Sequence, residues 1–150
     1  MKTLVKDPLN IVIVGVAGQG NVVTSTLICN ALIKEGHFVT FGQSYPSAQR
    51  GGSVINFIRV SEKYQCSPIV PRGKAHIIAG MEPVETLRML AEYGNPEVVT
   101  VVNIKPMASV DTTVEKLAFP PLDKLLEHIA DLSAKTIIIN ATDEGVGLLV

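Results

Sequence analysis

The chain has 150 residues, of which 47% are hydrophobic but only 5% aromatic, and its formal net charge is −1. This length fits a single domain over residues 1–150 with a core of Val, Ile, Leu and Ala. The near-neutral charge gives no reason to expect nucleic acid or an anionic membrane as a partner. No apolar run approaches the ~20 residues of a transmembrane helix. Because the segment before Pro8 is too short and too charged for a secretory signal, we expect a cytoplasmic protein.

The opening of the chain has the pattern of a strand, a helix and a second strand. Residues 10–14 are continuously β-branched, which is typical of a buried strand. A glycine-rich turn at residues 15–20 separates this strand from a helix predicted over residues 21–35. Gly36 is suited to end that helix in the left-handed conformation. Residues 37–41 are the second predicted strand, so the chain opens with a βαβ unit.

A long polar loop and an antiparallel hairpin are predicted next. Residues 42–52 are polar and bounded by glycine, and loops of this length in compact domains tend to be functional. Residues 53–60 alternate with period two, as a strand does. A second β-like segment, residues 65–70, follows too closely for a crossover helix to fit between them. The two segments are therefore predicted to form an antiparallel hairpin.

The second half of the chain alternates strands with helices. Strands are expected over residues 75–80, 98–103 and 136–140, and helices over residues 83–93 and 121–133, with an irregular stretch between 106 and 121. Pro83 suits the first position of its helix, and Glu82 and Glu85 suit the helix start. The sequence therefore predicts an α/β fold. We expect a Rossmann-like three-layer sandwich, with a mostly parallel sheet that carries the inserted antiparallel hairpin.

The glycine-rich turn Gly15-Val16-Ala17-Gly18-Gln19-Gly20 is a candidate anion site. A strand that enters such a turn and a helix that leaves it can present backbone N–H groups to a phosphate. Ala17 replaces the middle glycine of a dinucleotide fingerprint, and no acidic residue follows the second strand to bind a ribose hydroxyl. Three interpretations stay open: a structural turn alone, a site for a nucleotide or CoA phosphate, and an NAD or FAD site.

A second candidate is the segment Gln49-Arg50-Gly51-Gly52-Ser53. Arg50 stands between a polar loop and a strand, and the two glycines beside it permit close approach of the backbone. This placement suits an anion or the carboxylate of a partner, although a solvated loop arginine is the alternative. The candidate cofactor-binding residues are Gly15, Gly18, Gln19, Gly20, Gln49, Arg50, Gly51, Gly52 and Ser53.

Groups that could carry catalysis or bind a metal are few. His37, His76 and His128 have no Ser, Cys or carboxylate at a spacing that suggests a catalytic relay, so we expect no catalytic residue. The chain has two cysteines, Cys29 and Cys66, and neither has a further ligand at metal-binding spacing. Because a structural zinc site or an iron–sulfur cluster normally takes four ligands, we expect no metal site.

Four segments, in one order, match a known family: residues 11–20, 48–54, 67–71 and 80–88. In these segments the chain resembles the small (beta) subunit of indolepyruvate:ferredoxin oxidoreductase, a gamma-type domain of the 2-oxoacid:acceptor oxidoreductases. The resemblance spans residues 10–140, which is nearly the whole chain.

The resemblance implies a non-catalytic role in a larger complex. Such a complex converts a 2-oxo acid, here an arylpyruvate such as indolepyruvate, and CoA to acyl-CoA and CO2, and passes the electrons to ferredoxin. Thiamine diphosphate and iron–sulfur clusters belong to the large catalytic partner subunit, so no cofactor is expected in this chain. The isolated chain is expected to be inactive and able to self-associate. Arg50 and the turn at residues 18–20 are the expected contacts with CoA or substrate.

Two other interpretations of the chain stay open. A free-standing nucleotide-binding module predicts nucleotide affinity in the isolated chain. An enzyme with its own active site predicts turnover by the isolated chain.

Overall fold

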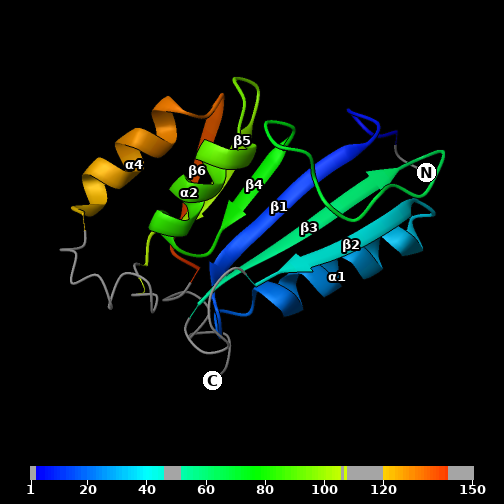
Figure 1. The fold of residues 1–150 in the computed structure, drawn as a ribbon, viewed down its shortest axis with the longest axis horizontal. Coiled ribbons are helices and arrows are strands. Elements are labelled where there is room, and N and C mark those ends of the chain that lie inside the picture. The colour runs from blue at the N-terminus through cyan, green and yellow to red at the C-terminus, as the bar shows by residue number, and fades with distance from the viewer. Residues whose placement is uncertain (1–2, 46–51, 106, 108–119, 142–150) are drawn as a thin grey trace.

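The computed structural model of the chain describes residues 3–45, 52–105, 107 and 120–141. These residues form, in chain order, β1 (Leu9–Val16), α1 (Asn21–Lys34), β2 (Phe38–Ser44), β3 (Ser53–Ser61), β4 (Ile77–Gly80), α2 (Pro83–Tyr93), β5 (Val99–Asn103), α4 (Leu122–Asp131) and β6 (Lys135–Ile139). The strands lie side by side in one sheet in the order β2-β3-β1-β4-β5-β6 (Figure 1).

Of the six described strands, only β3 runs against the others. β1, β4, β5 and β6 pair in parallel, whereas β3 lies antiparallel between β1 and β2. The predicted βαβ unit is therefore present, but its two parallel strands are separated by the inserted β3. The mostly parallel sheet with an antiparallel insertion confirms the predicted α/β class.

Helices cover both faces of the sheet, with α1 and α2 on opposite sides (Figure 1). On one face Cys29 of α1 packs with Ile11, Ile13, Ile58 and Val60 of β1 and β3. On the other face α2 and α4 pack on a larger cluster that includes Val12, Val14, Phe57, Ile78, Met89, Leu90, Tyr93, Val102 and Ile129. Both clusters consist mainly of aliphatic side chains and contain few aromatic ones, as the composition of the sequence predicts.

The second arm of the predicted hairpin is wrong, because residues 65–70 form a loop and not a strand. The loop crosses the α2 side of β2 and β3, where Thr40 Oγ1 donates to the carbonyl of Cys66 at 3.0 Å. A β-carbon at Gly42 would lie 2.7 Å from the carbonyl oxygen of Pro68, so the loop lies directly on the strand. Val70 is buried in the core. Val70 thus anchors residues 65–70, which we call the covering loop, to the core.

The remaining boundaries agree closely with expectation. The helix predicted over residues 83–93 is α2, and Pro83 lies in its first turn. The polar loop predicted to begin at residue 42 begins later, because β2 continues to Ser44. Most of the predicted irregular stretch between 106 and 121 lies outside the described residues. In the described part of the chain, none of the helices is long and apolar enough to cross a membrane.

Candidate functional site

The candidate site lies where β1 and β4 end. From the carboxyl end of β1 the chain turns into α1 on one face of the sheet, and from the end of β4 it turns into α2 on the other face. This divergence of two neighbouring parallel strands is a topological switch point, the place where open α/β sheets bind ligands. We call the space between the two turns the switch-point crevice.

The glycine turn forms one wall of the switch-point crevice. Gly18 and Gly20 have φ angles of 96° and 81°, which lie in the left-handed region that glycine adopts without strain. Gly20 is the N-cap of α1, and its carbonyl accepts from Thr24 N–H at 2.9 Å. A β-carbon at either glycine would meet no atom of the described residues within 4 Å. The backbone conformation therefore requires glycine at both positions, and the space beside them is open.

The Gln19 side chain is turned into the protein. Its Oε1 accepts from Val16 N–H at 2.7 Å, and its Nε2 donates to the carbonyl of Met81 at 3.2 Å. Gly15 makes room for it, because a β-carbon there would lie 2.8 Å from Gln19 Oε1 and from Met81 Cβ. Gln19 and Gly15 thus connect the β1 turn to the β4 turn and hold the two walls of the crevice together.

Asn103, at the end of β5, was not predicted as a site residue, but it completes this connection. Its Nδ2 donates to the same Met81 carbonyl at 3.1 Å, and its Oδ1 accepts from Ala141 N–H at 3.0 Å. Asn103 is 3% exposed. The two side-chain amides of Gln19 and Asn103 therefore link the carboxyl ends of β1, β4, β5 and β6. The available sequence signal was a polar residue that directly follows a buried β-branched run.

The structure brings the second predicted segment next to the first. The carbonyl of Gly52 accepts from Ala17 N–H at 3.0 Å, and Ser53 is opposite Val16 in the β1–β3 register. Ser53 is 1% exposed. Gln49, Arg50 and Gly51 lie outside the described residues. Of the nine predicted cofactor-binding residues, the six described ones are thus grouped around the carboxyl end of β1.

Two buried carboxyl groups begin α2 on the opposite wall. Glu82 is the N-cap, and its Oε2 accepts from Glu85 N–H at 2.8 Å, which confirms the predicted helix-start role. Both glutamates are 1% exposed. Burial raises the pKa of Glu82, and hydrogen bonds from backbone N–H groups offset only part of this effect. Glu85 is paired instead, because Arg88 Nη1 lies 3.1 Å from its Oε1.

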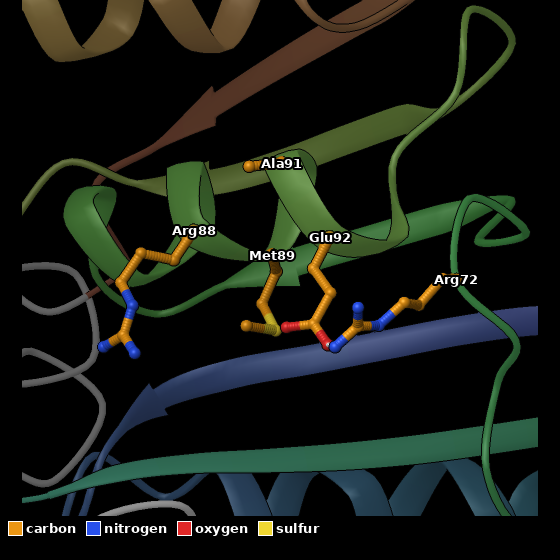
Figure 2. Close-up of a pocket in the computed structure, with 5 residues that line it drawn as sticks. All are labelled: Arg72, Arg88, Met89, Ala91 and Glu92. Carbon is orange, nitrogen blue, oxygen red and sulfur yellow. Dashed lines mark ion pairs between the residues drawn. The ribbon is translucent and has the colours of Figure 1, made fainter.

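Arg88 also borders a surface pocket of about 410 Å³ between α2 and the loop that carries Arg72 (Figure 2). Arg72 and Glu92 form an ion pair of 3.1 Å there. In Figure 2 the Arg88 side chain lies apart from this pair and extends toward the carboxyl end of β1. Its side chain is 47% exposed, and its positive charge is paired with the Glu85 carboxylate. Arg88 is the last residue of the family-like segment 80–88, but its charge was not predicted to lie near the candidate site.

The three histidines and two cysteines do not gather at the crevice. His76 Nδ1 accepts from Asn10 N–H at 2.9 Å near the amino ends of the strands, and burial lowers its pKa. Cys29 is buried under α1, where burial raises its pKa, and Cys66 lies in the covering loop. Within residues 3–45, 52–105, 107 and 120–141, no three His, Cys, Asp or Glu side chains are grouped as metal ligands.

The fold, with its switch-point crevice, is that of a Rossmann-like α/β domain. Its family follows from comparison with known proteins, since the profile of the family described as pyruvate ferredoxin/flavodoxin oxidoreductase matches residues 10–145. The chain belongs to this family, and the resemblance predicted from the sequence is confirmed.

Curated relatives with the name "Indolepyruvate oxidoreductase subunit IorB" are similar over most of the chain. The one from Archaeoglobus fulgidus is 32% identical over 135 residues, which cover 90% of this chain and 66% of the relative. The one from Thermococcus kodakarensis is 35% identical over 122 residues, covering 81% and 59%. This chain therefore spans about two thirds of the length of these relatives or less.

Solved structures with low sequence identity share the fold. The pyruvate oxidoreductase subunit PORC of Thermotoga maritima has a TM-score of 0.65 at 17% identity, over 96% of this chain and 68% of that chain. The 2-oxoglutarate:ferredoxin oxidoreductase of Magnetococcus marinus has a TM-score of 0.67 at 18% identity, over 96% of this chain and 22% of that chain.

Proposed function

We propose that the chain is the small, non-catalytic subunit of a thiamine-dependent 2-oxoacid:ferredoxin oxidoreductase. The complex converts an arylpyruvate such as indolepyruvate and CoA to acyl-CoA and CO2, and the electrons pass to ferredoxin. Family membership and the names of the relatives support the reaction class and the substrate. The Magnetococcus marinus structure holds 2-oxoglutarate, coenzyme A and succinyl-CoA, which supports CoA as the co-substrate. The sequence favours a cytoplasmic complex.

Thiamine diphosphate and the iron–sulfur clusters are assigned to the large partner subunit. The thiol donors of this chain do not fit a cluster, because Cys29 is buried under α1 while Cys66 lies in the loop on the opposite face. A cluster takes four thiolates, and the whole chain has two cysteines. The proposed contribution of this chain is therefore to bind CoA or substrate and to orient it.

The switch-point crevice is the observation that carries a role in binding CoA. The open space beside Gly18 and Gly20 lies at the N-terminus of α1, where backbone N–H groups and the helix dipole favour an anion. A CoA phosphate is an anion that suits this position. Gly15 and Gln19 shape the wall, and Gly52 and Ser53 flank it. Gln49, Arg50 and Gly51 directly precede Gly52 in the sequence, and Arg50 is the positive charge of the proposed site.

The test is steady-state kinetics of the complex reassembled from this chain and the large subunit of the same organism. Arg50→Ala is expected to raise the KM for CoA about tenfold while leaving the KM for indolepyruvate unchanged. Lys63→Ala is the matched control, because it removes an exposed positive charge after β3, away from the crevice. An unchanged KM for CoA in Arg50→Ala rules out the proposed contact.

The same preparations separate the alternatives. Full activity of the large subunit alone contradicts a functional role for this chain in the reaction. Micromolar affinity of the isolated chain for ATP or NAD, measured by calorimetry, favours a free-standing nucleotide-binding module instead.

A further inference from the structure

A pocket lies at the edge of the sheet where the parallel strands begin. Figure 1 shows that this edge is opposite to the one where β1 ends in the switch-point crevice. The pocket has a volume of about 430 Å³, which is in the range of sites that bind small ligands. Its lining comes from the N-terminal segment, the end of α1 and the residues at or just before the starts of β1, β2, β4 and β5, all of them described. We call it the amino-end pocket.

The wall of the amino-end pocket is mainly apolar. Leu9 at the start of β1, Leu32 of α1 and Ile77 at the start of β4 line it and pack against the buried cluster between α1 and the sheet. Val99, beside Ile77 in register, continues the wall onto β5. Such a wall favours a hydrocarbon group of a ligand, because binding removes apolar surface from water.

The N-terminal segment, residues 3–6, forms another side of the pocket. It is attached to the rest of the domain at two points. Leu4 N–H donates to Glu62 Oε1, and Lys6 Nζ lies 3.2 Å from Glu97 Oε2. Leu4 also packs against the cluster under α1. The pocket is thus bounded by α1, by the strand starts and by a segment that other parts of the chain hold in place.

A buried histidine of the lining lacks a hydrogen-bond partner. The His37 side chain is 2% exposed, and its Nδ1 makes no hydrogen bond within the described part of the chain. Glu35 Oε2 lies 3.9 Å from Nε2, which is beyond hydrogen-bond distance. In the neutral ring this carboxylate favours the proton on Nε2, which leaves Nδ1 as an acceptor without a donor. A buried acceptor of this kind is costly unless a donor reaches it, and a ligand N–H group at this side of the pocket can supply one.

His76 is a second ring in the lining, but it is already hydrogen-bonded. Its Nδ1 accepts from Asn10 N–H at 2.9 Å, so its proton is on Nε2. Burial lowers the pKa of His76, and the ring is therefore uncharged near neutral pH. His76 thus does not repel a cation from the pocket.

The charges in the lining favour a cation. Glu35 and Glu97 are acidic and Lys6 is basic, and the ion pair between Lys6 and Glu97 neutralises one of the two carboxylates. Among the described residues, Glu35 makes no ion pair with a Lys or an Arg. The remaining negative charge therefore lies next to His37, whose Nδ1 lacks a donor. An ammonium group has the opposite charge and carries N–H donors, whereas Glu35 repels a carboxylate.

We propose that the amino-end pocket binds a small apolar amine, whose ammonium group lies at Glu35 and His37 and whose hydrocarbon body packs on Leu32, Ile77 and Val99. This inference does not rest on the proposed function, because the amino-end pocket and the switch-point crevice lie at opposite ends of β1. The 2-oxo acid and CoA of that function are anions, so the amine is a further ligand and not a substrate of the complex.

The experiment is a nuclear magnetic resonance titration of the isotope-labelled chain, which measures affinity and location together. The probes are 4-phenylbutylamine, 4-phenylbutanol and 4-phenylbutyrate, which share a phenylalkyl body and differ in charge. The amine is expected to bind about threefold to fivefold more tightly than the alcohol, and the carboxylate more weakly than both. The largest changes in amide chemical shift are expected at residues 3–6, 32–37 and 76–77.

Glu35→Gln removes the negative charge and leaves the apolar wall intact. The amine is then expected to bind no more tightly than the alcohol, while the affinity for the alcohol stays unchanged. Glu127→Gln is the matched control, because the Glu127 side chain on α4 is 60% exposed, against 56% for Glu35. The preference for the amine is expected to persist in this control, and its persistence in Glu35→Gln overturns the proposed position of the ammonium group.

Leu32→Trp tests whether the hydrocarbon body occupies the pocket, because the larger side chain fills the space. All three probes are expected to bind at least about tenfold more weakly, and the melting temperature of the variant shows whether it is folded. Wild-type affinities in a folded Leu32→Trp variant overturn the proposal. If this variant does not fold, Glu35→Gln still decides, since it changes an exposed side chain.

Three results with the wild type also overturn the proposal. They are no binding of the amine at millimolar concentration, equal affinity for the three probes, and chemical shift changes confined to residues 15–20 at the switch-point crevice. None of these results bears on the proposed function, which is tested with the large subunit.

Discussion

Gln19 is predicted to hold the two walls of the switch-point crevice together, and Gln19→Met tests this directly. Methionine keeps the length of the side chain but removes both hydrogen bonds. The Met81 carbonyl keeps its bond from Asn103 Nδ2, so the loss at that carbonyl is about 0.5–1 kcal/mol. Val16 is buried and loses the acceptor for its N–H, which costs about 1–3 kcal/mol. The expected total is about 1.5–4 kcal/mol.

Urea unfolding of the isolated chain measures this loss. In a domain of this size, about 1.5–4 kcal/mol corresponds to a decrease in melting temperature of roughly 3–16 °C. Gln65→Met is the control, since it also removes two side-chain hydrogen bonds, but Gln65 is exposed and its bonds to the Val39 carbonyl and Thr40 Oγ1 lie at the surface. A free energy of unfolding within about 0.5 kcal/mol of the wild type in Gln19→Met refutes the reasoning.

Three further substitutions test other parts of the same edge of the sheet. Gly80→Ala is expected to cost about 3 kcal/mol, because a β-carbon there would lie 1.6 Å from Thr86 Oγ1; combining it with Thr86→Gly recovers stability in chemical denaturation, and no recovery contradicts the clash. Gly20→Ala is expected to lower the free energy of unfolding by about 1–2 kcal/mol, because alanine is strained at a φ of 81°; an added β-carbon would meet no described atom. Gly20→Asn is expected to lower it less, and an equal loss in the two variants argues against a left-handed requirement. Because burial raises the pKa of Glu82 from 4.5, the folded chain holds that proton more tightly than the unfolded chain, and stability falls as pH rises from 4.5 through the raised pKa. Glu82→Gln is expected to reduce this fall as pH rises above 4.5, and an unchanged pH slope contradicts it.

The sequence was most informative where local signals decide the structure. α2 was predicted with its observed bounds, because Pro83 can only begin a helix and Glu82 is a good N-cap. The first strand and α1 were likewise evident from a β-branched run and a glycine turn. In each case the deciding residues lie within a few positions of one another.

The arrangement of β3 and of the covering loop could not be predicted in this way. The period-two pattern of residues 53–60 indicated a strand with one buried face, but in β3 nearly every residue is buried. Its position between β1 and β2 depends on long-range pairing. Residues 65–70 were assigned as a β-like segment of a hairpin because they follow residues 53–60 closely, whereas in the structure they form a loop that lies on β2, as at Gly42.

The candidate site was predictable in its location but not in its construction. The sequence placed Gly18 and Gly20 at a phosphate-type turn, and the structure gives both the left-handed conformation. It could not show that the Gln19 side chain points inward to Met81, nor that Asn103 reaches the same carbonyl. These contacts join residues up to 62 positions apart, and their geometry depends on the order of the strands in the sheet.

Anaerobic affinity purification of the tagged chain from its native host, with mass spectrometry and thiamine and iron analysis of the eluate, tests the central claim most directly. The account predicts a near-stoichiometric large subunit that carries thiamine diphosphate and iron–sulfur clusters and reduces ferredoxin with indolepyruvate and CoA. Recovery of the chain alone, or with partners that lack thiamine diphosphate, contradicts it.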